Sequence, residues 1–373
     1  KHYTFSFTAM QEKIYQVAVG LIPGIGAATT KTLISYCGSA EQIFKTPKGK
    51  LKNIPGIGAV TIENLQNTSV LNEAESIVRK AEKLDTQILF YTDSDYPTRL
   101  KQIPDAPTLL YYKGNTKVNP ERSIAIVGTR KATEYGKTIV RKLLEGLASY
   151  KPLVVSGLAY GIDIQAHRDA LELGLDTIGV MANGTDIIYP AVHKNTALKM
   201  IEQGGLMSEY TFGSIAEPMR FPARNRIIAG MADVTIVVEA TQSGGALITA
   251  DIANGYNREV MAVPGRITDL TSEGCNNLIK QNKAHTLTRA SDLIELLNWD
   301  IEPGIITHKN IILSDLEEDE LMIYAVLIDN EAIHIDELSW KAQLPMHKIS
   351  SVLLQMEFKG IVKALSGKKF SLR

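Results

Sequence analysis

The sequence has only two cysteines, and they lie far apart in the chain. Cys37 and Cys275 cannot form a thiolate metal cluster or a framework of several disulfides, which fits a reducing compartment. No apolar run approaches the roughly 20 residues that a membrane-spanning helix requires. The first residues, Lys1 to Gln11, lack the apolar core of a secretory signal. We therefore expect a cytoplasmic protein with no membrane anchor and no bound metal.

An excess of positive charge is also missing. The chain has 40 Lys and Arg residues against 41 Asp and Glu, so its net charge is −1. Without a global positive field, nucleic acid can be bound only through a local basic patch, or through a patch doubled by dimerisation. The 373 residues, 45% of them hydrophobic, are typical of a globular protein with about two or three domains.

The first 91 residues are predicted to form a helical domain with an internal repeat. The string LIPGIG at residues 21–26 recurs as NIPGIG at residues 53–58, each time ahead of a helical pattern. Glycine permits the tight left-handed turn and leaves backbone N–H groups free at the start of the next helix. The repeat resembles the helix-hairpin-helix, which commonly grips DNA phosphates. Two interpretations remain open, a scaffold and a working DNA contact.

Prolines indicate a connector over residues 92–122, with Pro97, Pro104, Pro107 and Pro120 spaced along it. Proline at this density disfavours regular helix, so we expect an extended linker wrapped on a domain. Residues 301–314 are predicted to form a second linker.

Residues 315–373 are predicted to form a compact module that resembles a winged helix and binds either duplex DNA or another protein. The expected helices span Asp319–Ile328, Ile335–Gln343 and Met346–Gly360, and the expected hairpin joins Ile361–Leu365 to Lys369–Leu372 through Ser366-Gly367-Lys368. Acidic residues 317–320 suit the start of a helix but would repel phosphate. Lysines at 359, 363, 368 and 369 are available to attract it.

The central block, residues 123–300, alternates short β-branched runs with helical patterns, which predicts a Rossmann-like, doubly wound α/β domain with a mostly parallel sheet. The runs are apolar on both faces, as a buried parallel sheet requires. The strand candidates are Ser123–Gly128, Leu153–Gly157, Thr177–Ala182, Gly205–Glu209, Val234–Glu239, Val260–Pro264 and a weaker one at His285–Thr288.

Ligands of open α/β sheets bind at the carboxyl ends of the strands, where the strand order reverses. The first such end carries Gly128, Thr129 and Arg130, which combine a glycine turn, a helix start and a two-pronged phosphate donor. It is not a dinucleotide fingerprint, because Arg130 stands where a second glycine belongs. It is not a Walker P-loop either, because Lys131 replaces the required glycine.

Two further glycine-rich turns enter helices after later strands. One contains Ser156, Gly157, Ala159 and Gly161, and the other contains Gly244 and Gly245; both are potential anion cradles. The first also precedes Asp163 and His167. We interpret Asp163 as a cap or turn residue and His167 as a packed side chain, with a catalytic pair as the alternative.

Arg224, Asn225 and Arg226 follow the fourth strand, ahead of an apolar helical stretch. Guanidinium groups near a helix start favour phosphate. The alternative is a pair of buried arginines that brace loops through salt bridges with Glu209 or Glu239. Several anion-friendly turns along one edge suit a polynucleotide, which carries many phosphates.

Taken together, the central motifs resemble the DprA/Smf family of DNA-processing proteins. They are G-x-R at 128–130, SG-x-A-x-GID-x-x-AH at 156–167, D-x-x-YP at 186–190, FP-x-RNRIIAG at 221–230, GALITA at 245–250 and AVPG at 262–265. Thr133 departs from the family's usual serine, and residues 282–284 lack its usual glycine. The resemblance implies single-stranded-DNA binding, dimerisation through the Rossmann-like domain, and transfer of the strand to the RecA recombinase in natural transformation.

By this resemblance, Arg130 and the arginines of residues 224–226 contact DNA, and Lys280 is a further candidate. Bases would rest on Tyr160 and Phe221. We expect no catalysis and no cofactor. One alternative is a Rossmann-like nucleoside-monophosphate phosphoribohydrolase with its acid at Glu239 or Asp251, and another is a scaffold for a recombinase.

Overall fold

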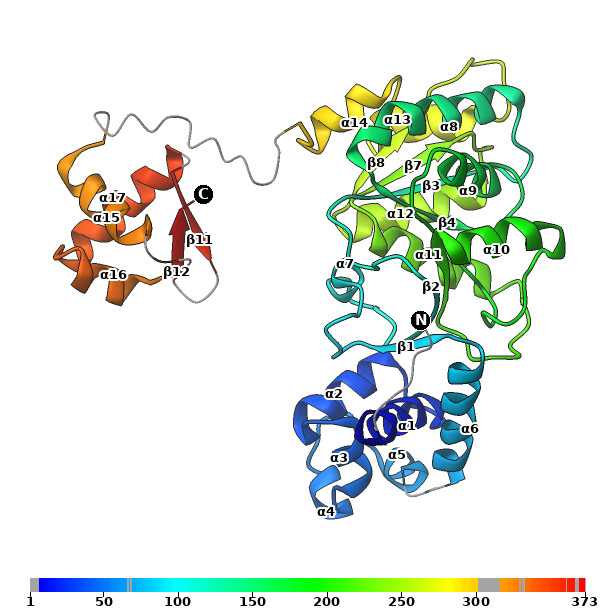
Figure 1. Ribbon diagram of the computed structural model, residues 1–373, viewed down its shortest axis with the longest axis horizontal. Coiled ribbons are helices and arrows are strands. Elements are labelled where there is room, and N and C mark those ends of the chain that lie inside the picture. Colours follow the sequence, from blue (N-terminus) through cyan, green and yellow to red (C-terminus); the bar gives the residue numbers. More distant parts are fainter. Residues whose placement is uncertain are drawn as a thin grey trace. The chain divides into compact units, whose positions relative to one another are not determined.

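The structure, a computed structural model, divides into two compact units, Lys1–Leu297 and Asn298–Arg373. Figure 1 shows the elements of both units. The described residues are 7–65, 67, 69–300, 316–328, 330, 333–359, 361–365 and 369–372. Within these ranges, no helix is both long and apolar enough to cross a bilayer. The same residues contain no group of three or more potential metal ligands.

The first unit begins with a helical domain (blue in Figure 1) whose helices enclose a core of their own. Its elements are α1 (Phe7–Leu21), α2 (Ala27–Cys37), α3 (Ala40–Lys45), α4 (Lys48–Leu51), α5 (Ala59–Asn64) and α6 (Ser69–Lys83). The two predicted turns lead into α2 and α5. Gly24 and Gly56 have φ of 80° and 79°, in the left-handed region that favours glycine. Whether these hairpins contact DNA stays a prediction.

The central sheet confirms the predicted α/β fold. In the described part of the chain it has nine strands in the order β1-β2-β6-β5-β4-β3-β7-β8-β9. The strands from β6 to β9 in this order run parallel, and their order reverses between β3 and β7. They are β1 (Gln87–Phe90), β2 (Leu109–Gly114), β3 (Ser123–Gly128), β4 (Leu153–Gly157), β5 (Thr177–Val180), β6 (Gly204–Ser208), β7 (Val234–Val238), β8 (Glu259–Ala262) and β9 (His285–Thr286).

The stretch predicted as an extended connector contains regular structure. It holds the short helix α7 (Thr98–Lys101) and strand β2, which pairs antiparallel with β6 and, on its other side, with β1. Both strands thus extend the central sheet beyond the predicted block. The prolines lie outside β2, so none of them breaks the strand's hydrogen-bond ladder.

Several strands end earlier than predicted, for local reasons. β7 stops at Val238 because Glu239 has φ of 57°, which an extended strand does not accommodate. β8 stops at Ala262, two residues before Pro264, whose nitrogen cannot donate to the ladder. β3 and β4 have the predicted bounds.

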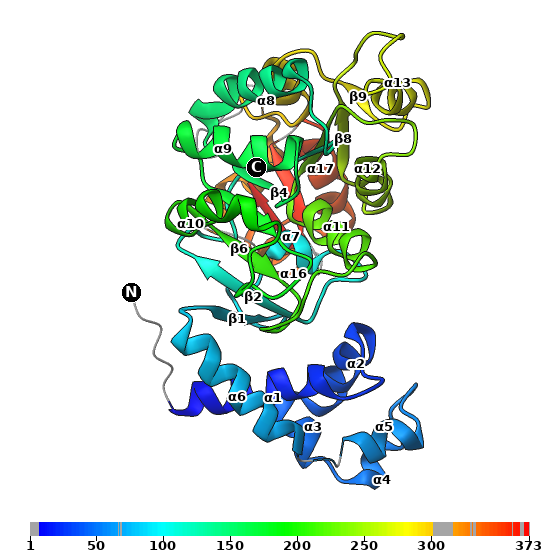
Figure 2. The ribbon, with the colours of Figure 1, turned by 90° about the vertical axis from the view of Figure 1, so that its right-hand side faces the viewer.

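Helices cover both faces of the sheet. Figure 2 shows α8 (Glu134–Leu147), α9 (Ile162–Glu172) and α10 (Lys194–Glu202) to the left of the sheet, with α11 (Arg220–Met231) and α12 (Gly245–Gly255) to the right. Helix α14 (Ala290–Leu296) packs on α8, and α13 (Glu273–Lys280) lies beside β8. Short 3-10 turns occupy Ala148–Tyr150 and Ala191–His193.

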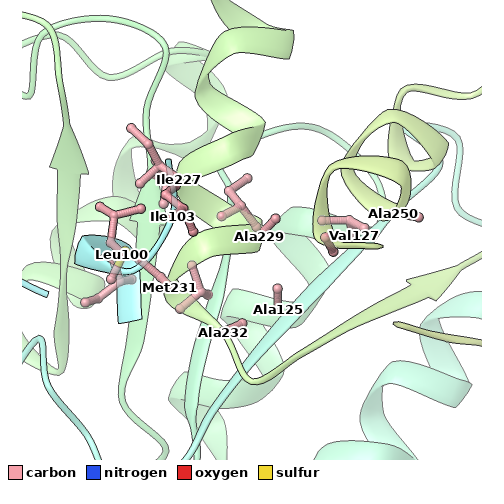
Figure 3. Close-up of a cluster of buried hydrophobic side chains, with 14 of the residues drawn as sticks. Leu100, Ile103, Ala125, Val127, Ile227, Ala229, Met231, Ala232 and Ala250 are labelled. Atoms are coloured by element: carbon pink, nitrogen blue, oxygen red, sulfur yellow. The ribbon is translucent and has the colours of Figure 1, made fainter. Parts of the chain in front are cut away.

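The connector is part of the main core. Figure 3 shows Leu100 and Ile103 beside Ile227, Ala229 and Met231 of α11. A Cβ atom on Gly230 would lie 2.8 Å from Leu100 and 2.9 Å from Ile103, so the absence of a side chain there lets α7 approach α11. This contact fixes α11 against the sheet.

The second unit confirms the predicted winged-helix module. It contains α15 (Glu318–Ile328), β10 (Ile333–His334), α16 (Ile335–Lys341), α17 (Met346–Phe358), β11 (Val362–Leu365) and β12 (Lys369–Leu372). Strand β10, which was not predicted, pairs with β12. Lys359 is bonded to the buried carboxylate of Glu320 at 2.7 Å, so it is less available to DNA than expected. The predicted linker 301–314 and the turn Ser366-Gly367-Lys368 lie outside the described residues.

Candidate nucleic-acid interface

A cavity of about 570 Å³ lies at the carboxyl ends of β3, β4 and β7, where the strand order reverses. We call it the switch cavity. The β3–α8 turn, the start of α9, helix α11 and the start of α12 form its walls. This is the position at which open α/β sheets bind ligands. Predicted site residues that line it are Gly128, Thr129, Arg130, Ala159, Arg224, Asn225, Gly244 and Gly245.

The β3–α8 turn brings one exposed cation to the mouth of the cavity. A Cβ on Gly128 would overlap the Val238 carbonyl oxygen, so only glycine fits at this crossing. The Thr129 amide donates to the Glu239 carbonyl oxygen at 2.7 Å. Beyond it, the Arg130 guanidinium lies 5.5 Å from the centroid of the Phe221 ring, and no carboxylate of the described residues is within ion-pair distance of it. Arg130 is therefore free to bind an anion.

The start of α8 is not an open anion cradle, contrary to the prediction. Glu239 is buried, and its carboxylate accepts a hydrogen bond from the Thr133 amide at 2.9 Å and another from the Thr133 hydroxyl. The Thr133 oxygen in turn accepts from the Gly136 amide. A protein carboxylate therefore occupies this helix end. Thr133 serves as the N-terminal cap of α8.

Most residues of the β4–α9 turn allow close packing around the cavity and do not themselves line it. The Ser156 hydroxyl is buried and donates to the Ile126 carbonyl at 2.5 Å. A Cβ on Gly157 would meet the side chains of Asp163 and Arg224. Gly161 has φ of 79° and passes so close to the Thr129 carbonyl that no side chain fits. Of the four predicted residues in this turn, only Ala159 is among those that line the cavity.

Two titratable side chains are buried at this end of the sheet, and one of them, Asp163, lines the cavity. Burial raises the pKa of the Asp163 carboxyl to about 6, although the Arg224 charge opposes that rise. Burial lowers the pKa of the His167 imidazole to about 4. His167 Nε2 lies 2.8 Å from the Gly157 carbonyl oxygen, which can only accept, and Nδ1 lies 2.6 Å from the Thr177 hydroxyl. His167 is thus a packed, neutral side chain, as we interpreted it.

Arg224 forms the floor of the switch cavity. It is only 5% exposed, and burial lowers the pKa of its guanidinium. Its Nη1 donates to the Val180 carbonyl oxygen, and its Nε donates to Asn225 Oδ1 at 3.2 Å. Nη2 has no hydrogen-bond partner among the described residues, and no carboxylate there lies within ion-pair distance. A buried guanidinium with a free donor beside a cavity is suited to an anionic ligand.

The structure does not bring Arg226 into the cavity. Its guanidinium pairs with Glu209 at 2.5 Å and lies 3.8 Å from Asp105, so the salt-bridge alternative describes this residue. Helix α11 begins at Arg220, and side chains two positions apart on a helix diverge by roughly 200°. Arg224 and Arg226 therefore face opposite sides. Lys280 ends α13 and is exposed outside the lining of the cavity.

The start of α12 remains open as a donor site. Gly244 precedes its first turn, no side chain caps the helix, and both Gly244 and Gly245 line the cavity. The free N–H groups of an uncapped helix start attract negative charge. This is the one predicted cradle, among the described residues, that offers amides to the cavity.

A smaller hollow of about 40 Å³ adjoins the switch cavity and shares Arg130 and Arg224 with it. We call it the aromatic hollow, because Tyr160, Tyr189 and Phe221 line it. Tyr160 and Tyr189 are half-exposed, and the rings of Tyr189 and Phe221 lie 6.1 Å apart. Tyr160 and Phe221 were predicted here. Tyr189 was missed as a contact, although a tyrosine next to a proline after a strand was a visible signal.

Comparison with known proteins agrees with this geometry. Residues 87–298 match the family described as DNA recombination-mediator protein A, and residues 312–368 match the DprA winged helix domain. The chain belongs to the DprA/Smf family. It is 30% identical to protein Smf of Synechocystis over 98% of this chain and all of that one. It is 41% identical to DNA processing protein DprA of Streptococcus pneumoniae over 54% of this chain and 71% of that one.

Solved DprA structures have the same fold. The crystal structure of the Streptococcus pneumoniae protein superposes with a TM-score of 0.64, 32% identity, and coverage of 76% of this chain and 97% of that one. The Helicobacter pylori protein, whose structure concerns its single-stranded-DNA binding mode, gives a TM-score of 0.53 and 29% identity over 58% of this chain and 97% of that one. In this DprA/Smf member, the cavity lies within the matched domain.

The two carboxylates considered for catalysis are both engaged elsewhere in this DprA/Smf chain. Glu239 holds the Thr133 cap, as described above. Asp251 is exposed and pairs with Lys283 at 2.8 Å. Neither is among the residues that line the switch cavity. Asp163, which does line it, is the carboxyl that an enzymatic interpretation would have to use.

Proposed function

We propose that this chain binds single-stranded DNA in the switch cavity without chemically changing it, protects the strand, and passes it to the RecA recombinase during transformation. The observation that carries the proposal is the buried Arg224 guanidinium, whose Nη2 is free at the floor of the cavity. Arg130 at the mouth and the uncapped start of α12 add donors on two other sides. Three converging donor groups suit a phosphodiester.

The aromatic hollow favours a single strand over a duplex. Unpaired bases can stack on exposed rings, whereas the bases of a duplex are stacked on each other. Tyr160, Tyr189 and Phe221 offer such surfaces directly beside the arginines. Phosphates would then lie in the switch cavity while a neighbouring base rests in the hollow. Such binding depends on salt and little on sequence.

Salt-dependent binding tests the proposal. Fluorescence anisotropy would compare single-stranded and duplex oligonucleotides over a salt series for the full chain, Arg130→Ala and Arg224→Ala. Each cation that contacts a phosphate contributes about 0.7 to the slope of log affinity against log salt for single strands. We expect each variant to lose roughly that amount of slope and about tenfold in affinity, or about 1.4 kcal/mol.

Arg141 provides the control, because it lies on α8 outside the cavity and pairs with Glu145 and Glu172. Circular dichroism checks that the Arg224 variant is folded. Affinities within twofold of the parent chain in both cavity variants would contradict the assignment. Release of free base from nucleoside monophosphates would instead support the phosphoribohydrolase alternative.

Two partners are part of the proposal. Self-association through the central domain is supported by the exposed side chains of Ile267 and Leu270, which follow β8 and are 92% and 70% exposed. It would also double the few cavity cations of a chain with net charge −1. Light scattering of the full chain and of Ile267→Asp would test it.

Transfer to RecA is supported by family membership alone, and RecA ATP hydrolysis on coated single strands would test it.

A further inference from the structure

One wall of the aromatic hollow is held by a turn, residues 183–190, that has no regular secondary structure over most of its length. Asn183, Tyr189 and Pro190 from this turn line the hollow. Between them lies Asp186, whose two carboxylate oxygens share the N–H of Gly213, at 2.9 and 3.1 Å from its nitrogen. The turn is therefore tied to the 211–214 segment.

The 211–214 segment is in turn anchored in the helical domain. The Phe212 ring packs against that domain's core and lies edge-on to Tyr111, 5.2 Å between centroids. Lys80, near the end of α6, places its ammonium 5.3 Å from the Phe212 ring centroid and 2.9 Å from Asp186 Oδ2. One side chain of the helical domain thus contacts both the segment and the turn.

The contact between Lys80 and Asp186 joins opposite charges. Burial by itself would raise the pKa of Asp186, but the Gly213 amide and the Lys80 ammonium outweigh it and lower the pKa. The Asp186 side chain is only 16% exposed, while that of Lys80 is 47% exposed. Asp186 is thus held as an anion by donors from two segments, one of which belongs to the helical domain.

We infer that Lys80 is a positioning residue through which the helical domain shapes the base-binding wall of the aromatic hollow. Lys80 is not among the residues that line either the cavity or the hollow, so it acts through Asp186 on the turn that carries Tyr189. The inference rests on the proposed function, because it concerns how bases are held there. It assigns the helical domain a part in DNA binding that needs no DNA contact of its own.

The experiment separates contacts to bases from contacts to phosphates. Affinities of the full chain would be measured for a normal single strand and for an abasic strand of equal length. Lys80→Met keeps the aliphatic stem over Phe212 and removes the charge. Lys83→Met, on the same helix with an exposed side chain, is the matched control. Lys80→Arg should keep the parent affinity.

We expect Lys80→Met to weaken binding of the normal strand about two- to fivefold, because the loss of one partly exposed ion pair costs up to about 1 kcal/mol. Binding of the abasic strand and the salt slope should stay unchanged. Asp186→Asn should have a similar or larger effect. The double variant should bind no more weakly than Asp186→Asn alone, because both substitutions break the same contact.

Equal affinities of Lys80→Met and Lys83→Met would overturn the inference. So would equal weakening of both strands with a shallower salt slope, which would identify Lys80 as a direct phosphate contact. Arg130→Ala and Arg224→Ala should weaken binding of both the normal and the abasic strand. They distinguish a failure of the proposed function from a failure of the inference about Lys80. If both Arg130→Ala and Arg224→Ala leave the affinities unchanged, the proposed function fails and the inference fails with it; if only Lys80→Met has no effect, the proposed function stands.

Discussion

The stability of the central domain should depend on pH in a way that reveals two buried groups, Asp163 and His167. Asp163 has a pKa of about 6 against 3.8 for a free carboxyl, mainly because it is buried. His167 has a pKa of about 4 against 6.5, for the same reason. Between pH 4 and 6 the folded chain therefore holds a proton on Asp163 that the unfolded chain releases. It also lacks a proton on His167 that the unfolded chain binds.

The two contributions have opposite signs and similar size. One pKa unit corresponds to about 1.4 kcal/mol, so each group changes the free energy of unfolding by about 3 kcal/mol. The Asp163 contribution is present in full below its unfolded pKa of 3.8 and is lost as the pH rises to about 6. The His167 contribution is present above 6.5 and is lost as the pH falls to about 4. In the parent chain the two nearly cancel.

Single substitutions should reveal how each group alone makes the free energy of unfolding depend on pH. Urea unfolding at pH values from 4 to 7 would give the free energy of unfolding of each variant and of the parent. Taking the difference between variant and parent removes the contributions of the other titrating groups. For Asp163→Asn this difference should rise by about 3 kcal/mol with pH, and for His167→Gln it should fall by about as much. Neither group is among the charges that shift the other, so the slopes are independent. The exposed Asp269, changed to Asn, is the control; flat differences for both variants would refute the reasoning.

Two further substitutions test buried carboxylates that hold loops or helices. Glu239→Gln replaces the charged acceptor of the Thr133 cap and should lower the free energy of unfolding by about 2 kcal/mol. It should also weaken single-stranded-DNA binding through the Arg130 turn, whereas Glu134→Gln, exposed nearby, should change neither. Lys359→Met leaves Glu320 without its cation and should destabilise the second unit by about 2 kcal/mol. Far-UV circular dichroism of the full chain during urea unfolding would measure this loss, with the exposed Lys363, changed to Met, as the control.

The strands of the central sheet were predictable because burial on both faces leaves a clear pattern. β3 and β4 are continuous apolar runs next to glycine, and their bounds follow from sequence. β2 was missed because prolines at both ends of the connector suggested a linker, although the run Leu109–Gly114 is itself free of proline. A strand that pairs antiparallel at the edge of a parallel sheet is not followed by a crossover helix. The alternation of strand and helix patterns that identified the other strands is therefore missing.

The site was predictable in its location but not in the direction of each side chain. Three glycine turns at one sheet edge indicated where the cavity lies. The string RNR could not show that Arg224 faces the cavity while Arg226 turns to Glu209, since this depends on where α11 begins. Likewise Glu239 closes the cradle at α8 only because of its left-handed backbone. Contacts over long separations, such as Lys80 with Asp186, leave no local pattern at all.

The proposed function lets a chain with net charge −1 bind a polyanion, because the position of its cations matters more than their number. Arg226 is neutralised by a carboxylate and Lys280 lies elsewhere, which leaves Arg130 and Arg224 as the arginines that line the cavity. Arg224 is shielded from water, so its attraction for a phosphate is screened less than that of a surface cation. A site with two cations predicts a shallow salt slope, near 1.4 in magnitude for one protomer. The proposed function therefore requires that much of the affinity come from amide donors and from stacking in the aromatic hollow, whose wall carries Tyr189.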